Sequence, residues 1–502
     1  MNPVCAASAD SENLGSSPAK SKLLHSRYNP EGEAERYINS LSLDNRIRFF
    51  ILIEPGLGYI TAPLRKKIPG ARVIALHAAR HSELWQDSPL KTEAPDSEWY
   101  PDTGISVQDF LEREITDSEA SVMRILEWRP ALSVYGRAYL ALVEEAAAFI
   151  KRSDANTRTL KGFGRSWVRN FFKNLTLIRE VLCPVPFSVP LLVTGAGPGL
   201  EEAIPLIRKK PGRDKLFILA VSSSVAALEA GNLRPDMVIS TDGGGWAVCH
   251  LHECFRVKRA GASLPYSLAA ALVAALPSQS ESLSILPISD GSLWQTLILR
   301  ELKIPFIVLP QRGTVSASAL DLAFALTNNE IFIAGIDLAN RDIRSHARPY
   351  SFDRFLEEKA GRLNPVYSQT YRRSSLLKAG GSYDIYASWF KKQILSYPKR
   401  LHSLGKNNPL FSSLETASPD STPGTVSDSV KFNTITLKCE EDPIAKALAI
   451  LEKALKDTEY SAALRQELDT LLFPGREASS REELVDTIRS LSCRNRGSVQ
   501  HG

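Results

Sequence analysis

The middle of the chain alternates short apolar runs with stretches whose apolar residues recur at helical spacing. The runs are partly β-branched, and each is followed by a turn or the start of a helix. This alternation is typical of an α/β fold with a mostly parallel, doubly wound, Rossmann-like sheet. The predicted strands are 191–193, 216–221, 235–242, 283–287, 305–309 and 330–335, and the predicted helices between them include about 200–209, 293–302 and 315–326.

The first of these strands leads into a glycine-rich turn, Gly195-Ala-Gly-Pro-Gly199, and then a helix. Gly195 and Gly197 permit backbone angles that other residues avoid, and they let a ligand approach the main chain. Pro198 suits the start of a helix, where its missing N–H costs nothing. Unpaired amides at such a helix start form an anion site, so we expect phosphate or nucleotide binding. The third glycine of a dinucleotide fingerprint is replaced by Leu200, and a merely tight turn is the alternative interpretation.

Polar residues follow several other predicted strands. In a doubly wound sheet the ligand lies beyond the carboxyl ends of the strands, so these residues are predicted to converge on one site. They are 195–199, Ser222–Ser224, Asp242, 312–316 and Asp337.

Five segments are expected along the chain. They are a disordered tail at 1–24, an N-terminal α/β domain at 25–150, the Rossmann-like core at 151–400 with a helical bridge at its start, a linker at 401–436, and a small helical appendage at 437–502. Strands at 49–53 and 72–76 flank a glycine turn in the α/β domain, and apolar spacing predicts helix over 117–150. Because residues 76–80 lack the acid that usually holds ribose, we expect a structural or partner-binding domain.

Composition narrows the function classes. The chain has 502 residues, 23% of them charged, and a net charge of +5, which fits a globular protein without a dedicated nucleic-acid surface. Its polar N-terminus resembles no secretory signal, and the longest apolar run, at 264–276, is too short to span a membrane. Six scattered cysteines fit a reducing compartment, so we expect a cytoplasmic protein.

Cys249-His-Leu-His-Glu-Cys254 places four Cys and His residues, all possible metal ligands, within six positions. A zinc site usually takes paired ligands from two elements, and the sequence has no second pair nearby. An ordinary helix with a polar outer side is therefore the favoured interpretation.

Three motifs occur in an order that resembles a known group. They are Gly195-Ala-Gly-Pro-Gly-Leu-Glu201, Gly231-Asn-Leu-Arg-Pro-Asp236 with Asp242 shortly after, and Gly335-Ile-Asp-Leu338 followed by His346-Ala347. They resemble the bacterial motility accessory factors (Maf) and the wider group with an MptE-like domain, which includes archaeal 6-hydroxymethylpterin diphosphokinase. Residues 26–38 with Gly56-Leu-Gly-Tyr59 look like the N-terminal domain of the motility factors, so the resemblance covers about 25–400.

The resemblance implies a glycosyltransferase that moves a nonulosonic acid from a CMP-activated donor to Ser or Thr of flagellin, with a core similar to sialyltransferases. On that reading Gly195, Gly197, Gly199, Ser222 and Ser223 cradle the nucleotide. Gly313, Thr314 and Ser316 lie near the sugar or phosphate, and Asp337 closes the floor of the site. A sugar carboxylate calls for arginine, for which the candidates are Arg312, Arg341, Arg344 and Arg348.

The chain departs from the family pattern at two places. Gly199 stands where relatives usually carry Ser, and Gly381-Ser-Tyr-Asp384 stands where the sialyltransferases carry their general-base His. The remaining candidates for the base are His346, Asp384 and Asp242. Among them His346 has the ordinary pKa that suits a base near neutral pH. Asp242 is also the candidate for holding Mg²⁺ through a substrate phosphate.

Three functions therefore stay open. The first is the flagellin glycosyltransferase, and the second is a diphosphokinase that acts on a pterin-like alcohol with ATP and Mg²⁺. The third is a non-catalytic scaffold that keeps the nucleotide-sugar fold and binds flagellin. A separate N-terminal protein-binding module favours the first over the second.

Overall fold

The computed structural model describes residues 24–493, except 44–46, 48, 81–92, 116–122, 210–215, 257–265, 342, 380–381, 405–408, 412–413, 415–431, 438–441, 458–459, 474–477 and 479. The predicted tail up to residue 23 and most of the predicted linker lie outside the described residues. The chain divides into two compact units, Met1–Thr159 and Leu160–Gly502, each with its own hydrophobic core.

The first unit is a small parallel α/β domain. Its elements are α1 Pro30–Ser40, β1 Phe49–Ile53, α2 Thr61–Lys67, β2 Arg72–Leu76, β3 Ser97–Trp99, α4 Val107–Glu114, β4 Met123–Glu127 and α5 Pro130–Tyr135. The sheet order is β3-β2-β1-β4, with all pairs parallel. Asn29 caps α1 by accepting a hydrogen bond from the Gly32 amide at 2.7 Å.

One prediction for this unit is wrong. The apolar spacing after residue 117 predicts helix, but Met123–Glu127 forms β4 and pairs in register with β1. The buried partner strand overrides the helical periodicity of a short apolar run. Helix begins after it, with α5 and then α6, Arg137–Leu175, which starts in the first unit and ends in the second.

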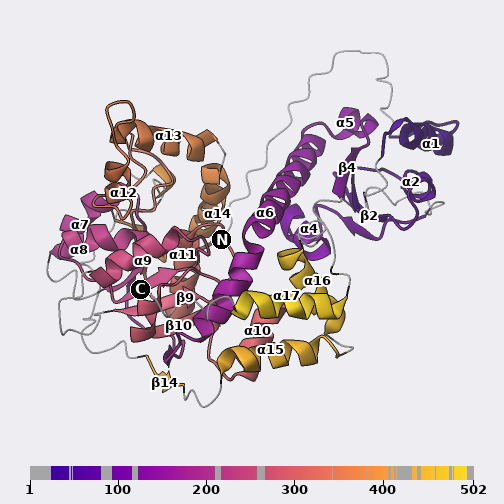
Figure 1. Cartoon of the computed structure of the whole chain (residues 1–502). Helices are drawn as coiled ribbons and strands as arrows, with labels where there is room; N and C mark the ends of the chain where they lie inside the picture. The colour runs from indigo at the N-terminus through magenta and orange to yellow at the C-terminus, as the bar shows by residue number, and fades with distance from the viewer. Residues whose placement is uncertain are drawn as a thin grey trace, which may run out of the picture. The chain divides into compact units, whose positions relative to one another are not determined.

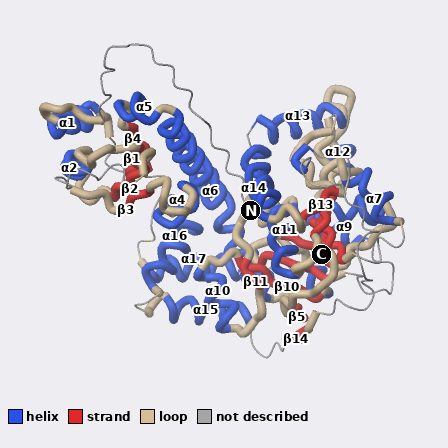
Figure 2. Tube along the Cα trace, turned by 180° about the vertical axis from the view of Figure 1, so that it is seen from behind, coloured by secondary structure: helices blue, strands red, loops and turns tan. Residues whose placement is uncertain are grey.

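The second unit is built on a ten-stranded sheet, in the order β13-β12-β6-β7-β8-β9-β10-β5-β14 with β11 beside β10 (Figures 1 and 2). Its pairs are parallel except β5 with β14. The elements up to β12 are β5 Glu180–Leu182, β6 Leu191–Thr194, α7 Leu200–Arg208, β7 Phe217–Val221, η3 Ser222–Ser224, α8 Val225–Ala230, β8 Met237–Ser240, α9 Ala247–Arg256, β9 Ser267–Ala271, η4 Ser278–Ser282, β10 Ser284–Ser289, α10 Leu293–Glu301, β11 Ile307–Val308, α11 Val315–Leu326 and β12 Ile331–Ala334. The predicted doubly wound, mostly parallel fold class is thus confirmed.

Between β6 and β12 the direction in which strands are added reverses. From β6 the chain adds β7, β8, β9 and β10 on one side, and it then returns to place β12 on the other side of β6. Right-handed crossovers put connections of opposite direction on opposite faces. Accordingly α7, α8 and α9 contact one another in sequence, whereas α11 packs on β6, β7 and β8. The switch point therefore lies between β6 and β12, which is where doubly wound sheets bind ligands.

Beyond β12 the chain adds mainly helices. They are α12 Asp353–Glu358, α13 Val366–Ala379 and α14 Ser382–Ser396, which gather together in Figures 1 and 2, then β13 Leu401–Ser403, η5 Pro409–Phe411, β14 Thr434–Thr436, α15 Pro443–Ala454, α16 Ser461–Leu472 and α17 Arg481–Cys493. The predicted helical C-terminal region is present, and α15 and α16 pack on α10. No helix in the described parts of the chain is long and apolar enough to cross a membrane.

Candidate functional site

The glycine turn lies at the switch point and touches the turn that follows β12. The strands are in register there, with Thr194 beside Ala334, so Gly195 and Gly335 face each other. A side chain at Gly195 would collide with the carbonyl oxygen of Gly335, and one at Gly335 would lie about as close to the oxygen of Gly195. Gly335 also has a positive φ of 67°. Glycine is needed at both positions because the two backbones approach this closely.

The turn's amides are used within the protein. The amide of Gly195 donates to the Ala334 carbonyl at 2.8 Å, and that of Gly197 donates to the Gly335 carbonyl at 2.7 Å. The Gly199 amide donates to Oδ2 of Asp337 at 2.6 Å. These three hydrogen bonds contradict the prediction that the amides of the glycine turn are unpaired. The strand β12 and the turn after it supply acceptors that the sequence of the glycine turn itself does not reveal.

Asp337 places a carboxylate at the start of α7. Burial raises the pKa of this carboxyl, while the Gly199 amide and the Arg341 charge lower it and Glu202 raises it further. A side chain on Gly199 would lie 2.6 Å from Oδ1 of Asp337, so the small residue at this position makes room for the carboxylate. The positive end of the helix thus already faces an anionic group of the chain itself.

The predicted arginines pair with the first turn of α7. Arg344 Nη1 lies 2.9 Å from Glu201 Oε1, and Arg341 Nη1 lies 2.6 Å from Glu202 Oε1. The backbone amide of Arg348 also donates to Glu201 at 2.9 Å. These contacts fasten the segment after β12 onto the start of α7. A ligand carboxylate would therefore compete with Glu201 and Glu202 for these guanidinium groups.

His346 is held on the same segment, next to the glycine turn. Its neighbour Ala347 donates from its amide to the Ala196 carbonyl at 2.8 Å. The His346 ring stacks on Tyr350 with 4.1 Å between centroids, and its Nδ1 lies 2.8 Å from the Ser345 hydroxyl. The structure therefore brings the backbone next to the predicted base into contact with the predicted nucleotide turn.

The serines after β7 divide into different roles. Ser224 is buried, and its hydroxyl donates to the Val221 carbonyl at 2.8 Å and lies 3.1 Å from the Thr194 hydroxyl. These bonds join the carboxyl ends of β6 and β7. Ser222 is buried and Ser223 is half-buried, and both lie at the same edge, one strand from the glycine turn. Sequence reasoning missed Thr194 because it lies inside the strand.

Asp242 follows β8 and is exposed. Its Oδ1 accepts from the Gly244 amide at 2.8 Å, which makes a local turn, and its carbonyl accepts from the Ala275 amide at 3.0 Å. Trp167 of α6 packs so closely on Gly243 that a side chain there would collide with the indole. Asp242 lies at the predicted edge of the sheet, two strands from β6.

The loop before α11 is covered by α14. Arg312 Nε lies 2.7 Å from Asp321 Oδ2, and its guanidinium stacks 5.5 Å from the Trp389 ring. Burial raises the pKa of Asp321, although Arg312 lowers it. A side chain at Gly313 would lie 2.6 Å from the Tyr386 ring. These contacts hold the loop that leads into α11 through Thr314 and Ser316.

The last two candidates are Asp384 and the 249–254 cluster. The side chain of Asp384 lies outside the described residues. Within the described parts of the chain, no group of three His, Cys, Asp or Glu side chains is placed to hold a metal ion. The 249–254 cluster lies on α9, where His250 Nδ1 is 3.0 Å from the Ser351 hydroxyl.

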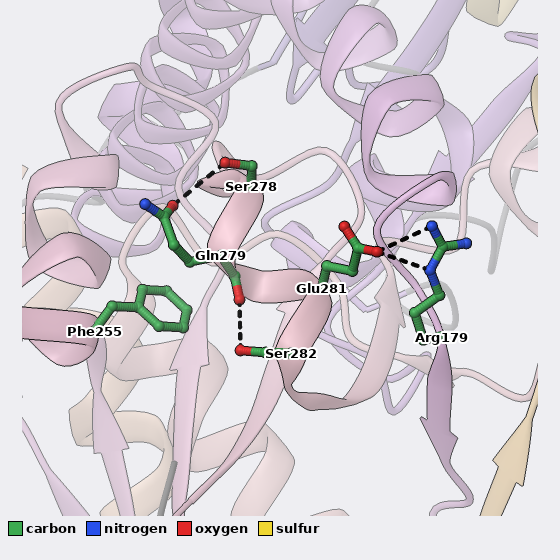
Figure 3. Close-up of a pocket in the computed structure, with 6 residues that line it drawn as sticks. All are labelled: Arg179, Phe255, Ser278, Gln279, Glu281 and Ser282. Carbon is green, nitrogen blue, oxygen red and sulfur yellow. Dashed lines mark hydrogen bonds and ion pairs between the residues drawn. The ribbon is translucent and has the colours of Figure 1, made fainter. Parts of the chain in front are cut away.

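A hollow of about 550 Å³ lies elsewhere on the second unit. Figure 3 shows its lining, which comprises Arg179, Phe255, Ser278, Gln279, Glu281 and Ser282. Arg179 and η4 precede β5 and β10, so the hollow lies at the amino ends of these strands. Ligands of doubly wound sheets bind at the opposite ends, and we do not place the site here.

Sequence reasoning missed a polar cluster in the first unit. Glu54, which follows β1 with a positive φ of 47°, is fully buried and lies 3.4 Å from Nδ1 of the buried His77. On the other side of His77, Nε2 lies 3.8 Å from Glu98, and Tyr100 stacks on the ring at 4.4 Å. The position after β2, where an acid would usually hold ribose, is thus occupied by His77, which lies between Glu54 after β1 and Glu98 in β3.

Comparisons with known proteins agree with the motif order. Residues 165–342 match the family described as 6-hydroxymethylpterin diphosphokinase MptE-like. This match confirms the predicted MptE-like domain. An uncharacterized protein of Treponema pallidum (strain Nichols) is 27% identical over 290 residues, which are 57% of this chain and 61% of that protein. The aligned region thus spans less than two thirds of that relative.

Two solved structures are also similar to this chain. The MAf glycosyltransferase from Magnetospirillum magneticum AMB-1 aligns with 92% of this chain and 78% of its own, with a TM-score of 0.46 and 12% identity. The sialyltransferase CST-II, in complex with a trisaccharide acceptor and CMP, aligns with 53% of this chain and 99% of its own. Its TM-score is 0.26 and its identity is 13%.

Proposed function

We propose that this protein is a glycosyltransferase that takes a nonulosonic acid from a CMP-activated donor and transfers it to Ser or Thr of flagellin. The observation that carries the proposal is the β6–β12 switch point of the MptE-like domain, where the segment that carries His346 bonds to the glycine turn through the Ala347 amide. The sugar and the flagellin acceptor follow from the resemblance of the motifs to the motility accessory factors. The free thiols of Cys183 and Cys249 suit a reducing compartment, and we place the reaction in the cytoplasm.

In this mechanism the nucleotide lies along the carboxyl ends of β6 and β7, near Gly195, Gly197, Gly199, Ser222 and Ser223. Arg341 and Arg344 hold the sugar carboxylate after exchanging their glutamate partners, and the loop of Arg312, Gly313, Thr314 and Ser316 borders the sugar. His346 takes the proton of the acceptor hydroxyl as that oxygen attacks the anomeric carbon and CMP leaves. The base stays a choice among His346, Asp242 and Asp384, and we favour His346 because of its position.

His346 provides the first test. A general base contributes about 10²-fold or more to a rate, so His346→Ala is expected to lower kcat for transfer to flagellin by about that factor. Binding of CMP should change little. His252→Ala is the matched control, because His252 is exposed on α9, and it should keep its activity within about twofold. Equal activity of the two variants would remove His346 from the reaction.

The second candidate is a diphosphokinase that uses ATP and Mg²⁺ on a pterin-like alcohol, and the description of the matching family favours it. Calorimetric titration with CMP, and separately with ATP plus Mg²⁺, separates the two enzymes. Micromolar binding of CMP without metal supports the transferase. Preference for ATP with Mg²⁺ overturns it and makes Asp242 the first residue to replace. Binding of neither nucleotide favours the flagellin-binding scaffold.

A further inference from the structure

The first turns of α13 have the reverse of the usual amphipathic pattern. A helix on the surface of a globular protein normally turns its apolar side inward and its polar side to solvent. Tyr367 and Tyr371, four residues apart and therefore on one side of α13, are 65% and 60% exposed. The polar residues between them, at 368–370, are half-buried, and Gln369 donates to the Asn364 carbonyl at 3.0 Å. The aromatic side of this helix therefore faces solvent.

The turn that leads into α13 presents a leucine in the same way. Gly361 and Asn364 close this turn with two backbone hydrogen bonds of 3.2 Å and 3.0 Å, so residues 362 and 363 form its tip. Leu363 is 95% exposed there and lies four residues before Tyr367. Three large apolar side chains thus project from one short segment, and exposed apolar groups gathered in this way mark an interaction surface.

The same part of the chain is strongly cationic. Residues 359–400 contain nine Lys and Arg and one acidic residue, so the other residues of the chain together carry a net negative charge. Arg362 lies beside Leu363 and Arg372 beside Tyr371, and both arginines are exposed. Helix α13 packs against α12 and α14, and it lies at an outer edge of the second unit in both views (Figures 1 and 2). Positive charge concentrated in this way indicates an anionic partner.

Helix α14 repeats the combination of an exposed leucine with cations. Leu395 is 81% exposed, and the exposed Lys391 and Lys392, four and three residues earlier, lie on the same side of the helix. Lys399, just after α14, is exposed as well. These charges add to the attraction that an anionic surface would exert on this part of the unit.

We propose that the exposed α13 surface, formed by Arg362, Leu363, Tyr367, Tyr371 and Arg372, binds the surface of an anionic phospholipid bilayer. The leucine and the two tyrosines enter the boundary between headgroups and acyl chains, where such side chains are favourable. The two arginines pair with the lipid phosphates. This inference goes beyond the proposed transferase function, and it is compatible with a cytoplasmic reaction because the cytoplasmic leaflet carries anionic lipids.

The shape and residue types of the exposed α13 surface favour a bilayer over a nucleic acid or a folded protein. Leu363 stands at the tip of a tight turn, and a projecting tip can enter the deformable boundary of a bilayer without a pre-formed pocket. The bases of a single-stranded nucleic acid stack on aromatic rings and guanidinium groups, and an aliphatic side chain offers neither. The leucine therefore distinguishes lipid from nucleic acid.

Vesicle flotation tests the inference on the full-length protein. The probes are large unilamellar vesicles of phosphatidylcholine, either alone or with about 30 mol% phosphatidylglycerol, in about 0.1 M NaCl. We expect partitioning into the anionic vesicles to be at least about tenfold stronger than into the neutral ones. Because salt screens the attraction, the partitioning should fall at least about fivefold in about 0.5 M NaCl.

Substitution of the apolar side chains tests their insertion. The variant with Leu363→Ser, Tyr367→Ser and Tyr371→Ser should partition about tenfold more weakly into anionic vesicles. The variant with Tyr367→Phe and Tyr371→Phe keeps both rings and should stay within about threefold of wild type. Since these side chains are exposed, both variants should keep the wild-type midpoint of urea unfolding.

Substitution of the cations tests the charge. Arg362→Gln with Arg372→Gln should lower partitioning into anionic vesicles about tenfold and change partitioning into neutral vesicles little. The matched control combines Tyr460→Ser with Lys453→Gln and Lys456→Gln, which removes an exposed tyrosine and two exposed cations from the C-terminal helices. It should partition within about twofold of wild type.

Three results would overturn the inference. They are equal partitioning of wild type into the two kinds of vesicle, wild-type partitioning by the serine or glutamine variant, and binding of a labelled oligouridylate by wild-type protein that leaves the vesicles unbound. CMP titration of the same samples distinguishes this inference from the transferase proposal. CMP binding should be the same in all variants, and failure of CMP to bind wild type would leave the membrane surface standing while the transferase proposal fails.

Discussion

Asp337 sets the charge at the start of α7. Its carboxylate accepts from the Gly199 amide at 2.6 Å, the position where a bound phosphate would be expected to accept. Burial raises the pKa of Asp337. Glycines at 197 and 199 leave the space that this side chain fills. A side chain introduced at Gly197 would collide with the Asp337 carboxylate, so a Gly197 variant would change more than phosphate binding.

Replacing Asp337 with asparagine tests this charge. The Asp337→Asn variant keeps an oxygen for the Gly199 amide but removes a negative charge from the anion site. We expect CMP to bind about three- to tenfold more tightly, which corresponds to about 1 kcal/mol of relieved repulsion. Calorimetry in low and high salt measures it, and the gain should shrink in high salt. Weaker binding would contradict this and show that the carboxylate itself holds a donor group of the nucleotide.

At the residue scale the sequence predicts where a close backbone approach occurs better than it predicts which groups hydrogen-bond to one another. The glycines of 195–199 mark a close approach of backbone, and the structure explains it through Gly335. The hydrogen bonds of the turn could not be predicted, because they depend on which strand lies beside β6. Likewise, Arg341 and Arg344 lie on the segment after β12, and their pairing with Glu201 and Glu202 arises from the path of that segment.

At the scale of elements, the C-terminal helices complete the second unit rather than extending from it. Glu467 of α16 accepts from the amides of Leu293 and Trp294, at 3.0 Å and 3.2 Å, and so caps the start of α10 from another part of the chain. Arg165 of α6 donates to the Leu472 carbonyl at 2.8 Å. Burial raises the pKa of Glu467, although the two amides lower it.

Glu467 gives a prediction for stability. Glu467→Ala leaves two amides without their acceptor and should lower the free energy of unfolding by about 1–2 kcal/mol. Because the folded-state pKa is raised, wild-type stability should fall as pH rises above about 4.5, until the folded pKa is passed. Glu467→Gln keeps an acceptor and should flatten this dependence. Urea unfolding from pH 4 to pH 7 measures it, and a pH slope unchanged in the Gln variant would contradict the assignment.

Elements were predictable where their pattern was long or flanked by caps. The core strands around 191, 217 and 331 follow directly from local sequence. Strands β4 and β9 could not be predicted from local sequence. Met123–Glu127 has the apolar spacing of a helix, and Ser267–Ala271 lies within an apolar run without alternation. Both are buried by neighbouring strands that are distant in sequence. Strand order could not be predicted either, since β5 pairs with β10 across 104 residues.

At the scale of the molecule, the first unit carries two histidines whose protonation acts in opposite directions. Burial lowers the pKa of His77, but its contacts with Glu54 and Glu98 raise it more, so the net shift is upward. Burial lowers the pKa of His25, and its Nε2 accepts from the Leu57 amide at 3.1 Å, which requires an unprotonated nitrogen. His25 contacts the turn after β1 through Leu57, and His77 contacts it through Glu54. Protonation of either histidine therefore affects the stability of the same part of the unit.

The signs of these shifts predict a stability maximum for the first unit. The stabilisation from His77 is complete below the ordinary histidine pKa of 6.5 and is lost as pH rises through the higher folded value. His25 has the opposite effect, because protonation of the unfolded chain below pH 6.5 favours unfolding. Amide hydrogen exchange of β1 and β2 in the full-length protein, corrected for intrinsic rates, should therefore show greatest protection near pH 6.5. His77→Gln should remove the decline on the alkaline side alone, and His25→Gln the decline on the acid side alone. Protection that is independent of pH in wild type would contradict both assignments, whereas a change on the wrong side in either variant would reverse the role given to that histidine.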